Sequence, residues 1–285
     1  MPRRIDHRSE HGNWTLFRGR PPAVLFPYVL EIQGYYEESA GSVVRRELPS
    51  SVIPLILVFG PGFTLHDLDG RARPRSLRRS FVAGLHEVPV LVGSEGQAVC
   101  MQVDLTPVGA WRLLGVDMHD LAGQVIDLRD VLDIGDELEG SLADAKDWPA
   151  RFALLEGILC RRILNGRSES PLAAAAFTSI ERTGGRVSIG GLAKTLGCSR
   201  KHLVTLFKRE IGLPPKSVAR LARFNRAMQH LQDGGFENLS DLAAACDYAD
   251  QAHFNRDFRA FAGECPTALL ARVLDDGSGI IDALR

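Results

Sequence analysis

The first part of the chain alternates short apolar runs with turn residues. Runs rich in Val, Leu and Ile recur between Ala23 and Thr106, and glycines and prolines separate them at short intervals. Many short strands with turn signals are typical of a sandwich or a small barrel. The pattern predicts strands over residues 24–32, 52–59, 80–84, 88–92 and 98–105.

The pattern becomes helical after the last of these runs. Pro107 begins a predicted short helix that ends at Leu114, and residues 141–164 form a longer amphipathic stretch. The part of this stretch over residues 150–164 has two possible roles. It either forms a dimer interface or packs on the barrel of its own chain.

One helical pattern occurs twice in the last third of the chain. The first copy reads Leu192-Ala193-x-x-x-Gly197 and continues to Phe207, and the second reads Leu242-Ala243-x-x-x-Asp247 and continues to Phe258. The offset between the copies is about 50 residues before the turn and one more after it, so a single residue is inserted in the second turn. Paired helix-turn-helix units are typical of proteins that read two successive major grooves of DNA.

Each copy separates an apolar stripe from a polar face. The stripes predicted to face the core are Leu203, Leu206 and Phe207 in the first copy, and Phe254, Phe258 and Phe261 in the second. Ser188, Ser199 and Asp250 are predicted helix caps. The predicted DNA-facing residues are Arg200, Lys201, Val204, Thr205 and Lys208, followed by Gln251, Ala252, Asn255, Arg256 and Arg259.

The chemistry of these faces suits base edges and phosphates. Lys and Arg can reach guanine or phosphate, Gln and Asn can pair with adenine, and the methyl groups of Thr and Val can touch a thymine methyl. The alternative is a plain helical bundle whose basic faces are only solvated. Two copies in register favour DNA binding over that alternative.

A single helix is predicted between the two copies. It begins at Pro215, reaches about Leu231 and ends at Gly234 and Gly235. Its length of about 25 Å could hold two DNA-reading helices about one DNA turn, or about 34 Å, apart.

The segments SRKHL (199–203), LFK (206–208) and ADQAHFNRDF (249–258), with Gly263 and Pro266, resemble the AraC/XylS family of bacterial transcription regulators. The resemblance covers about residues 171–273. It implies two helix-turn-helix units joined by a linker helix, and activation through contact with RNA polymerase, less often repression. It places base-reading positions at Lys201, Val204, Thr205, Gln251, Asn255 and Arg256.

The resemblance also implies a cupin-like N-terminal half that binds a small-molecule effector, forms a homodimer, or does both. The chain departs from the family at two places. Asp247 stands where the second turn usually has Gly, and Pro266 is followed by Thr-Ala-Leu-Leu instead of an aromatic residue and Arg. Asp tolerates the left-handed conformation less well than Gly, so the second turn is predicted to be slightly strained.

Charge separates the two halves of the chain. Residues 171–274 hold 14 Lys and Arg against 9 Asp and Glu, whereas residues 1–170 hold 19 against 23. A positive half is what binding to a phosphate backbone requires. The predicted fold is therefore two-domain α+β: a β-rich, cupin-like sensor over 1–140, a helical connector over 141–170, an all-α double helix-turn-helix domain over 171–274, and a tail over 275–285.

The composition limits other classes of function. No apolar run is long enough for a membrane span, and residues 1–20 are polar and basic, so the expected location is the cytoplasm. His66, His86 and His119 are isolated, so neither a metal site, a cofactor nor an enzyme is predicted. The five cysteines show no metal-binding or redox spacing and are expected to be free thiols: Cys100, Cys160, Cys198, Cys246 and Cys265.

The sequence therefore predicts a sequence-specific DNA-binding transcription regulator, an activator whose N-terminal half senses a small molecule, dimerises or does both. The expected partners are double-stranded DNA and RNA polymerase. The alternative is an enzyme or a ligand-binding domain fused to a DNA-binding module. An alkyl-transfer enzyme of that kind would need a reactive cysteine motif, and Cys100 lies between Val99 and Met101 without a local partner.

Overall fold

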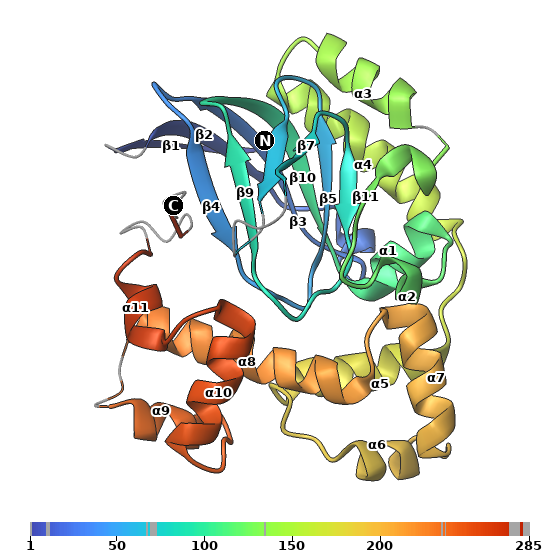
Figure 1. The fold of residues 1–285 in the computed structure, drawn as a ribbon. Helices are drawn as coiled ribbons and strands as arrows, with labels where there is room; N and C mark the ends of the chain where they lie inside the picture. The colour runs from blue at the N-terminus through green and yellow to red at the C-terminus, as the bar shows by residue number, and fades with distance from the viewer. Residues whose placement is uncertain are drawn as a thin grey trace.

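The computed structural model describes residues 2–9, 12–66, 68, 73–133, 135–234, 236, 238–273 and 280–281. Two β-sheets form the N-terminal part, and helices form the C-terminal part below them in Figure 1. This arrangement confirms the predicted fold class, a β-rich N-terminal part followed by a helical part with paired helix-turn-helix units.

The larger sheet has seven strands, and every neighbouring pair is antiparallel. In spatial order its strands are β1 (Arg3–Ser9), β2 (Gly12–Gly19), β3 (Val29–Glu38), β10 (Gln97–Leu105), β5 (Ile53–Val58), β8 (Phe81–Ala83) and β11 (Val125–Asp127). The smaller antiparallel sheet contains β4 (Val43–Glu47), β9 (Val90–Ser94), β6 (Phe63–His66) and β7 (Arg75–Leu77). The two sheets face one another, because Phe63 of the smaller sheet meets Phe81 of the larger one at a ring-centroid distance of 6.5 Å.

The strand prediction was wrong at the beginning of the chain. Residues 24 and 25 belong to a 3₁₀ turn, η1 (Ala23–Leu25), Phe26 follows it in a turn, and the strand starts only at Val29. Prolines at 22 and 27 flank the turn, and only Leu25 of its apolar residues is buried. The prediction also missed six strands, among them the hairpin of β1 and β2, because their polar and charged residues hide the apolar alternation.

The helices of the N-terminal part follow β10. Helix α1 (Pro107–Leu114) has the predicted bounds, with Thr106 accepting a hydrogen bond from the Gly109 backbone. The predicted single stretch over 141–164 was wrong, because two helices occupy this region. They are α3 (Gly135–Asp144) and α4 (Trp148–Leu164), and Asp147 between them caps α4 in an extended conformation.

Helix α4 packs on the outer face of the larger sheet. Gln33 and Tyr35 face the space between the sheets, so Gly34 between them faces outward, directly against the Trp148 ring. Phe17 of β2 stacks on the same ring at 4.4 Å. The apolar face of α4 is thus occupied within one chain, which is the alternative to a dimer interface. Its buried residues are Phe152, Leu155, Leu159 and Ile163.

In the described residues of the C-terminal part, every named element is a helix, and two isolated β-bridges involve Val273, Ile280 and Ile281. The helices are α5 (Pro171–Arg182), α6 (Ile189–Thr195), α7 (Arg200–Ile211), α8 (Pro215–Asp233), α9 (Leu239–Ala245), α10 (Gln251–Ala262) and α11 (Pro266–Leu270). Helix α8 begins at the predicted Pro215, and Gly234 ends it with φ 70°. None of the helices in the described ranges is both long and apolar enough to cross a membrane.

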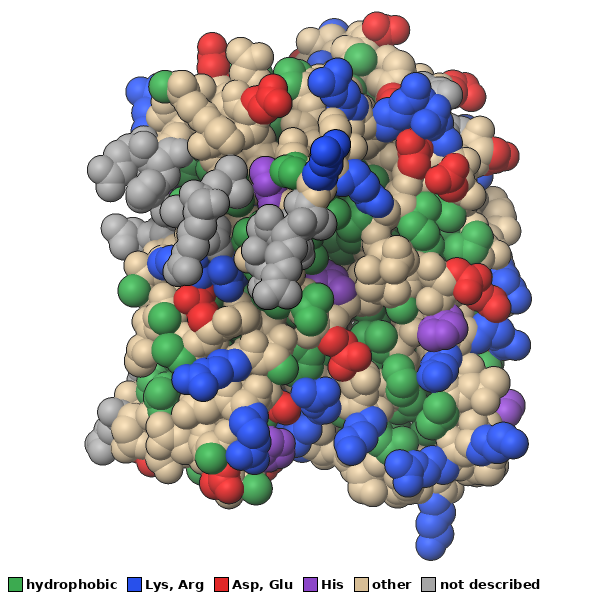
Figure 2. Space-filling view, in the orientation of Figure 1, with side chains coloured by type: hydrophobic (Ala, Val, Ile, Leu, Met, Phe, Trp, Pro, Cys, Tyr) green, Lys and Arg blue, Asp and Glu red, His purple; other side chains and the backbone are tan. Residues whose placement is uncertain are grey.

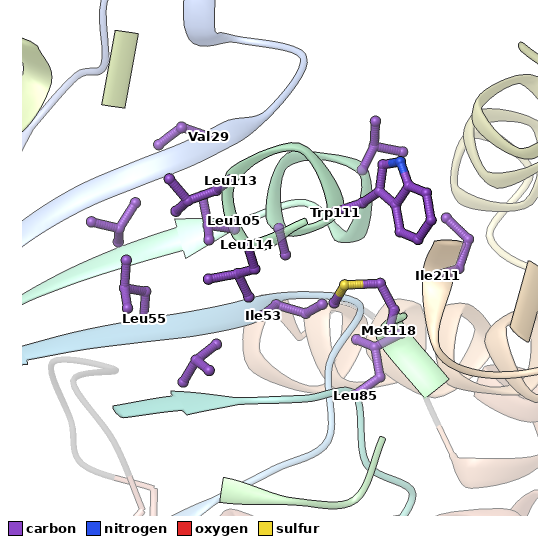
Figure 3. Packing of buried hydrophobic residues seen from close by; sticks show 14 of the residues in the cluster. Val29, Ile53, Leu55, Leu85, Leu105, Trp111, Leu113, Leu114, Met118 and Ile211 are labelled. Atoms are coloured by element: carbon purple, nitrogen blue, oxygen red, sulfur yellow. The ribbon is translucent and has the colours of Figure 1, made fainter. Parts of the chain in front are cut away.

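The apolar core crosses from the N-terminal part into the first helix-turn-helix unit. Helix α7 packs against α1 and against α2 (Met118–Leu121). Figure 3 shows Trp111, Met118 and Leu85 at this junction, with Ile211 of α7 beside them. The second unit instead has a separate cluster, built around Phe224, Phe254 and Phe258.

Replacing Leu155 by Asp is expected to lower the free energy of unfolding by about 4 kcal/mol or more, because it places a charge in an apolar site. Urea denaturation followed by circular dichroism measures this change. Leu164→Asp on the same helix is the matched control, since Leu164 is 41% exposed, and should change stability little. A folded Leu155→Asp chain with an altered oligomeric state would instead support a dimer interface here.

Candidate nucleic-acid interface

Side-chain caps begin the helices of both helix-turn-helix units. Ser199 accepts a hydrogen bond from the His202 backbone at 3.1 Å, and Asp250 accepts one from the His253 backbone at 2.6 Å. Ser188 caps α6 in the same manner through the Gly191 backbone. These caps satisfy donors that the first turn of a helix leaves unpaired, and all three were predicted.

The two turns have the same backbone conformation. Gly197 has φ 68° and Asp247 has φ 56°, which makes Asp247 the single residue other than glycine with positive φ in the described part of the chain. The residue after each of these two positions donates its backbone N–H to the backbone carbonyl oxygen of an alanine in the preceding helix. Cys198 donates to Ala193 at 3.0 Å, and Tyr248 donates to Ala243 at 2.9 Å. The left-handed conformation predicted for Asp247 is therefore present.

The apolar stripes face inward as predicted. Leu203 and Phe207 of α7, and Phe254 and Phe258 of α10, have no exposed surface. In α10 this stripe stacks on the linker helix, with the rings of Phe224 and Phe258 5.3 Å apart. Burial of these residues determines which face of each helix remains open to a partner.

The predicted DNA-facing residues lie on the opposite sides. In α7, Arg200, Lys201, Thr205 and Lys208 are exposed, and Val204 is half-buried at the flank. In α10, Gln251, Ala252, Arg256 and Arg259 are exposed, and Asn255 is half-buried. Each set therefore shares one side of its own helix. His202 is also exposed at the start of α7, although it was not among the predicted residues.

Helix α8 connects the two units. It has 19 residues, which corresponds to about 28 Å, and Figure 1 shows it running between the α6–α7 unit and the α9–α10 unit. Figure 2 shows Lys and Arg side chains spread over the lower half of this face, where these helices lie. The arrangement thus offers two exposed helices, one at each end of a rigid spacer, on a positively charged part of the molecule.

A buried aspartate on the inward side of α10 connects this helix to α8. Asp257 is only 8% exposed and accepts a hydrogen bond from Arg220 of α8 at 2.9 Å. This bond raises the pKa of the Arg220 guanidinium, which stays charged, and the same side chain reaches Glu87 of the N-terminal part at 3.5 Å. Neither Asp257 nor Arg220 was among the predicted residues. The available signal was an aspartate on the inward side of an otherwise apolar stripe.

The N-terminal part contacts the C-terminal ends of both α7 and α10. At α7, His119 Nδ1 lies 3.4 Å from the Gly212 carbonyl oxygen. At α10, the Arg46 guanidinium of β4 donates to the Ala262 carbonyl at 2.7 Å and pairs with Glu264 at 3.5 Å. Cations at helix C-termini are favourable because the helix dipole is negative there.

A cavity of about 440 Å³ lies between the two sheets. Its polar lining includes Arg18, Gln33, Arg45, Glu47, Gln102 and Asp104, together with Ser50, His86 and Gln124, and Phe63 and Phe81 belong to its apolar lining. Burial raises the pKa of the Glu47 and Asp104 carboxyls. Such a cavity has the size of a small-molecule site.

Metal and thiol chemistry have little support in the described part of the chain. No group of three or more His, Cys, Asp or Glu residues there could hold a metal ion. Cys100 faces the cavity between the sheets, but burial raises the pKa of its thiol to about 12. It is therefore protonated near neutral pH, and a protonated thiol is a poor nucleophile.

Comparison with known proteins finds a family model that matches part of the helical region. Residues 192–272 match a family model described as a helix-turn-helix domain. A protein of Escherichia coli (strain K12), described as the uncharacterized HTH-type transcriptional regulator YidL, is 30% identical over 104 residues. These residues are 36% of this chain and 34% of that protein, so the chain spans about a third of the length of this curated relative.

Solved structures are also similar to the chain. An AraC-type DNA-binding domain protein from Chromobacterium violaceum is 27% identical, with 36% of this chain and 91% of that chain covered and a TM-score of 0.33. Unsaturated fatty acid bound ToxT from Vibrio cholerae strain SCE256 is 11% identical, with 88% and 96% covered and a TM-score of 0.47.

The second turn generates a test of backbone strain. Asp247→Gly removes a side chain from a left-handed position, which favours the folded state by up to about 1 kcal/mol. It also removes the pair between Asp247 and Arg186, which are 2.9 Å apart and half exposed, and such pairs contribute about 0–1 kcal/mol. We therefore expect a gain of up to about 1 kcal/mol in an Arg186→Ala background, and a smaller gain in the natural chain.

Urea denaturation of the four chains (natural, each single variant and the double variant) measures both contributions. An unfolding midpoint of the double variant at or below that of Arg186→Ala alone would show that Asp247 carries no strain.

Proposed function

Since residues 192–272 form a helix-turn-helix domain of the AraC type, we propose that this protein is a transcription regulator that reads two successive major grooves of DNA. One observation carries the proposal. Two units with the same turn conformation lie at the two ends of α8, and each has an open, polar helix face. A spacer of about 28 Å is close to one turn of DNA, about 34 Å.

In this proposal α7 and α10 each enter a major groove. Lys201, Val204 and Thr205 of α7 read bases, while Arg200 and Lys208 bind phosphates. In α10 the base readers are Gln251, Asn255 and Arg256. Ala252 allows the helix to approach the groove closely, and Arg259 binds the phosphate backbone of the DNA. Amide side chains pair with adenine and Arg pairs with guanine, so the two helices read different sequences.

The regulator acts as an activator through contact with RNA polymerase, and its N-terminal half senses a small molecule. The cavity between the sheets supports the sensing role. Strand β4 supports a link from this cavity to α10. Arg45 and Glu47 line the cavity, and Arg46 between them donates a hydrogen bond to the Ala262 carbonyl oxygen at the end of α10. A ligand that shifts β4 would thereby shift the C-terminal end of α10. A homodimer would use a surface other than the apolar face of α4.

Selection of bound sites from a random DNA pool, with the purified chain at near-physiological salt, tests the proposal. We expect a motif with two short blocks about one helical turn apart. A motif with only one block would overturn two-groove reading. Failure of the folded chain to enrich any sequence would overturn sequence-specific binding by this chain alone.

The assignment of base readers makes a separate prediction. Arg256→Ala is expected to weaken binding by about 1–3 kcal/mol and to relax preference at one base pair, because a bidentate contact to guanine is lost. Lys208→Ala should weaken binding to all sequences alike and lower the salt slope by about one. Titration of the selected site and its single-base variants at several salt concentrations separates these outcomes. Equal weakening of every sequence by Arg256→Ala would contradict the assignment.

The link through β4 predicts a local effect of Arg46→Ala. Loss of the hydrogen bond to Ala262 should speed amide hydrogen exchange at the C-terminal end of α10 and leave α7 unchanged. It should also weaken binding to the two-block site several-fold without changing binding to the α7 block alone. Arg78→Ala removes an equal charge from an exposed site in the same half and is the matched control. Equal exchange in both variants would refute the link.

A further inference from the structure

We propose that the cavity between the two sheets binds a small organic cation, an amine carried on an apolar, aromatic-sized body. This inference rests on the sensing role proposed above and names the chemistry of its ligand. It is carried by the distribution of polar and apolar side chains inside the cavity and by the balance of charge among them.

Strand register places the polar side chains at one end of the cavity. Arg18 of β2 pairs with Gln33 of β3, and Gln33 pairs with Gln102 of β10. Asp104 is two residues further along β10, so it lies on the same face of the sheet. Glu47 of β4 completes this end from the smaller sheet.

Carboxyl groups outnumber cations here once the partners of the arginines are counted, with Glu31, Glu37, Glu47 and Asp104 against Arg18 and Arg45. Arg18 lies 3.6 Å from Glu31 beside the cavity, so its charge is already matched. Glu47 has no hydrogen bond or ion pair with any residue in the described ranges, and its exposed side chain lines the cavity. Asp104 accepts hydrogen bonds only from neutral amides, those of Gln102 at 2.7 Å and Gln33 at 3.5 Å.

The remaining cation, Arg45, is held by protein groups. Its guanidinium pairs with Glu37 at 3.4 Å and lies over the rings of Trp14 at 4.5 Å and Tyr35 at 5.3 Å. Its Nη2 atom has no hydrogen-bond partner among the described residues, but it also has no accessible surface, so a ligand in the cavity cannot reach it. An anionic ligand would therefore meet two carboxyl groups without a free guanidinium beside them.

The carboxyls show the same imbalance in their titration. Burial raises the pKa of Glu47 and of Asp104, and this effect exceeds the lowering by the charge of Arg45 at Glu47 and by the amide hydrogen bonds and the charge of Arg18 at Asp104. Neither carboxyl has an ion pair with a cation in the described ranges, so the charges of Arg45 and Arg18 act on them only from a distance and do not offset the cost of burial. A bound ammonium supplies a positive charge in direct contact and three N–H donors.

The opposite end of the cavity suits the apolar body of the ligand. Ile56 and Phe81 of the larger sheet face Phe63, Leu65, Leu77 and Val92 of the smaller sheet across it. The rings of Phe63 and Phe81 meet edge to face, at an interplanar angle of 83°, which is a favourable setting for a further aromatic ring. A volume of about 440 Å³ holds about fifteen non-hydrogen atoms.

Three probes that differ only in their polar end test the proposal on the full chain: 4-phenylbutylamine, 4-phenylbutyrate and 4-phenylbutan-1-ol. We expect the amine to raise the unfolding temperature in a concentration-dependent way and the carboxylate to have no effect. Calorimetric titration should show at least tenfold weaker amine binding for Glu47→Gln and for Asp104→Asn. Affinity for the alcohol should be retained, which shows that the cavity of each variant is intact.

Glu95→Gln, an exposed position in the turn between β9 and β10, is the matched control and should bind the amine normally. The proposal is overturned if the carboxylate binds as well as the amine, if neither cavity variant weakens the amine, or if the amine does not bind at millimolar concentration. The selection of DNA sites described above is carried out without ligand, so its outcome does not depend on these binding tests. A chain that selects a DNA motif but fails these binding tests keeps the proposed regulatory function and loses only this ligand class.

Discussion

Burial of apolar side chains where α1, α2 and α7 meet is the interaction on which the arrangement of this molecule depends. Trp111 and Met118 of the N-terminal part and Ile211 at the end of α7 are each at most 1% exposed. Burying one such side chain contributes about 1.5–3 kcal/mol. Because this core continues into the sheets, the first helix-turn-helix unit is packed as part of the N-terminal half. The exposed face of α7 is thereby oriented relative to the cavity.

The second unit is attached differently. Its aromatic core is separate, although Leu48 of the N-terminal part packs against it, and polar contacts through Arg46 and Arg220 also join it to the N-terminal part. Directional polar contacts of this kind are individually weaker than a shared core, and they can be exchanged for water or for other partners. The two units therefore have unequal freedom to move. A signal from the N-terminal half would reach α10 at lower energetic cost than α7.

Much of the helical part could be predicted because its signals are local. Ser199 and Asp250 cap helices within three residues, and Gly197 and Asp247 specify turns within five. The strands were harder to predict, because an edge strand such as β1 is identified by its partner across the sheet rather than by its own residues. The break between α3 and α4 did have a local signal, because Asp147 is a helix-capping residue. The apolar periodicity on both sides of it instead suggested one continuous helix.

By itself the sequence determined the two helix-turn-helix units, their caps and turns, and which residues of α7 and α10 stay exposed, since each of these depends on spacings within one unit. Only the tertiary structure decided that α7 shares a core with the N-terminal half and that Arg220 supports Asp257. It also decided that Glu47 and Asp104 face one cavity, although 57 positions separate them in the chain. Contacts of this kind arise from sheet register and from packing between distant elements. Local periodicity specifies neither of these.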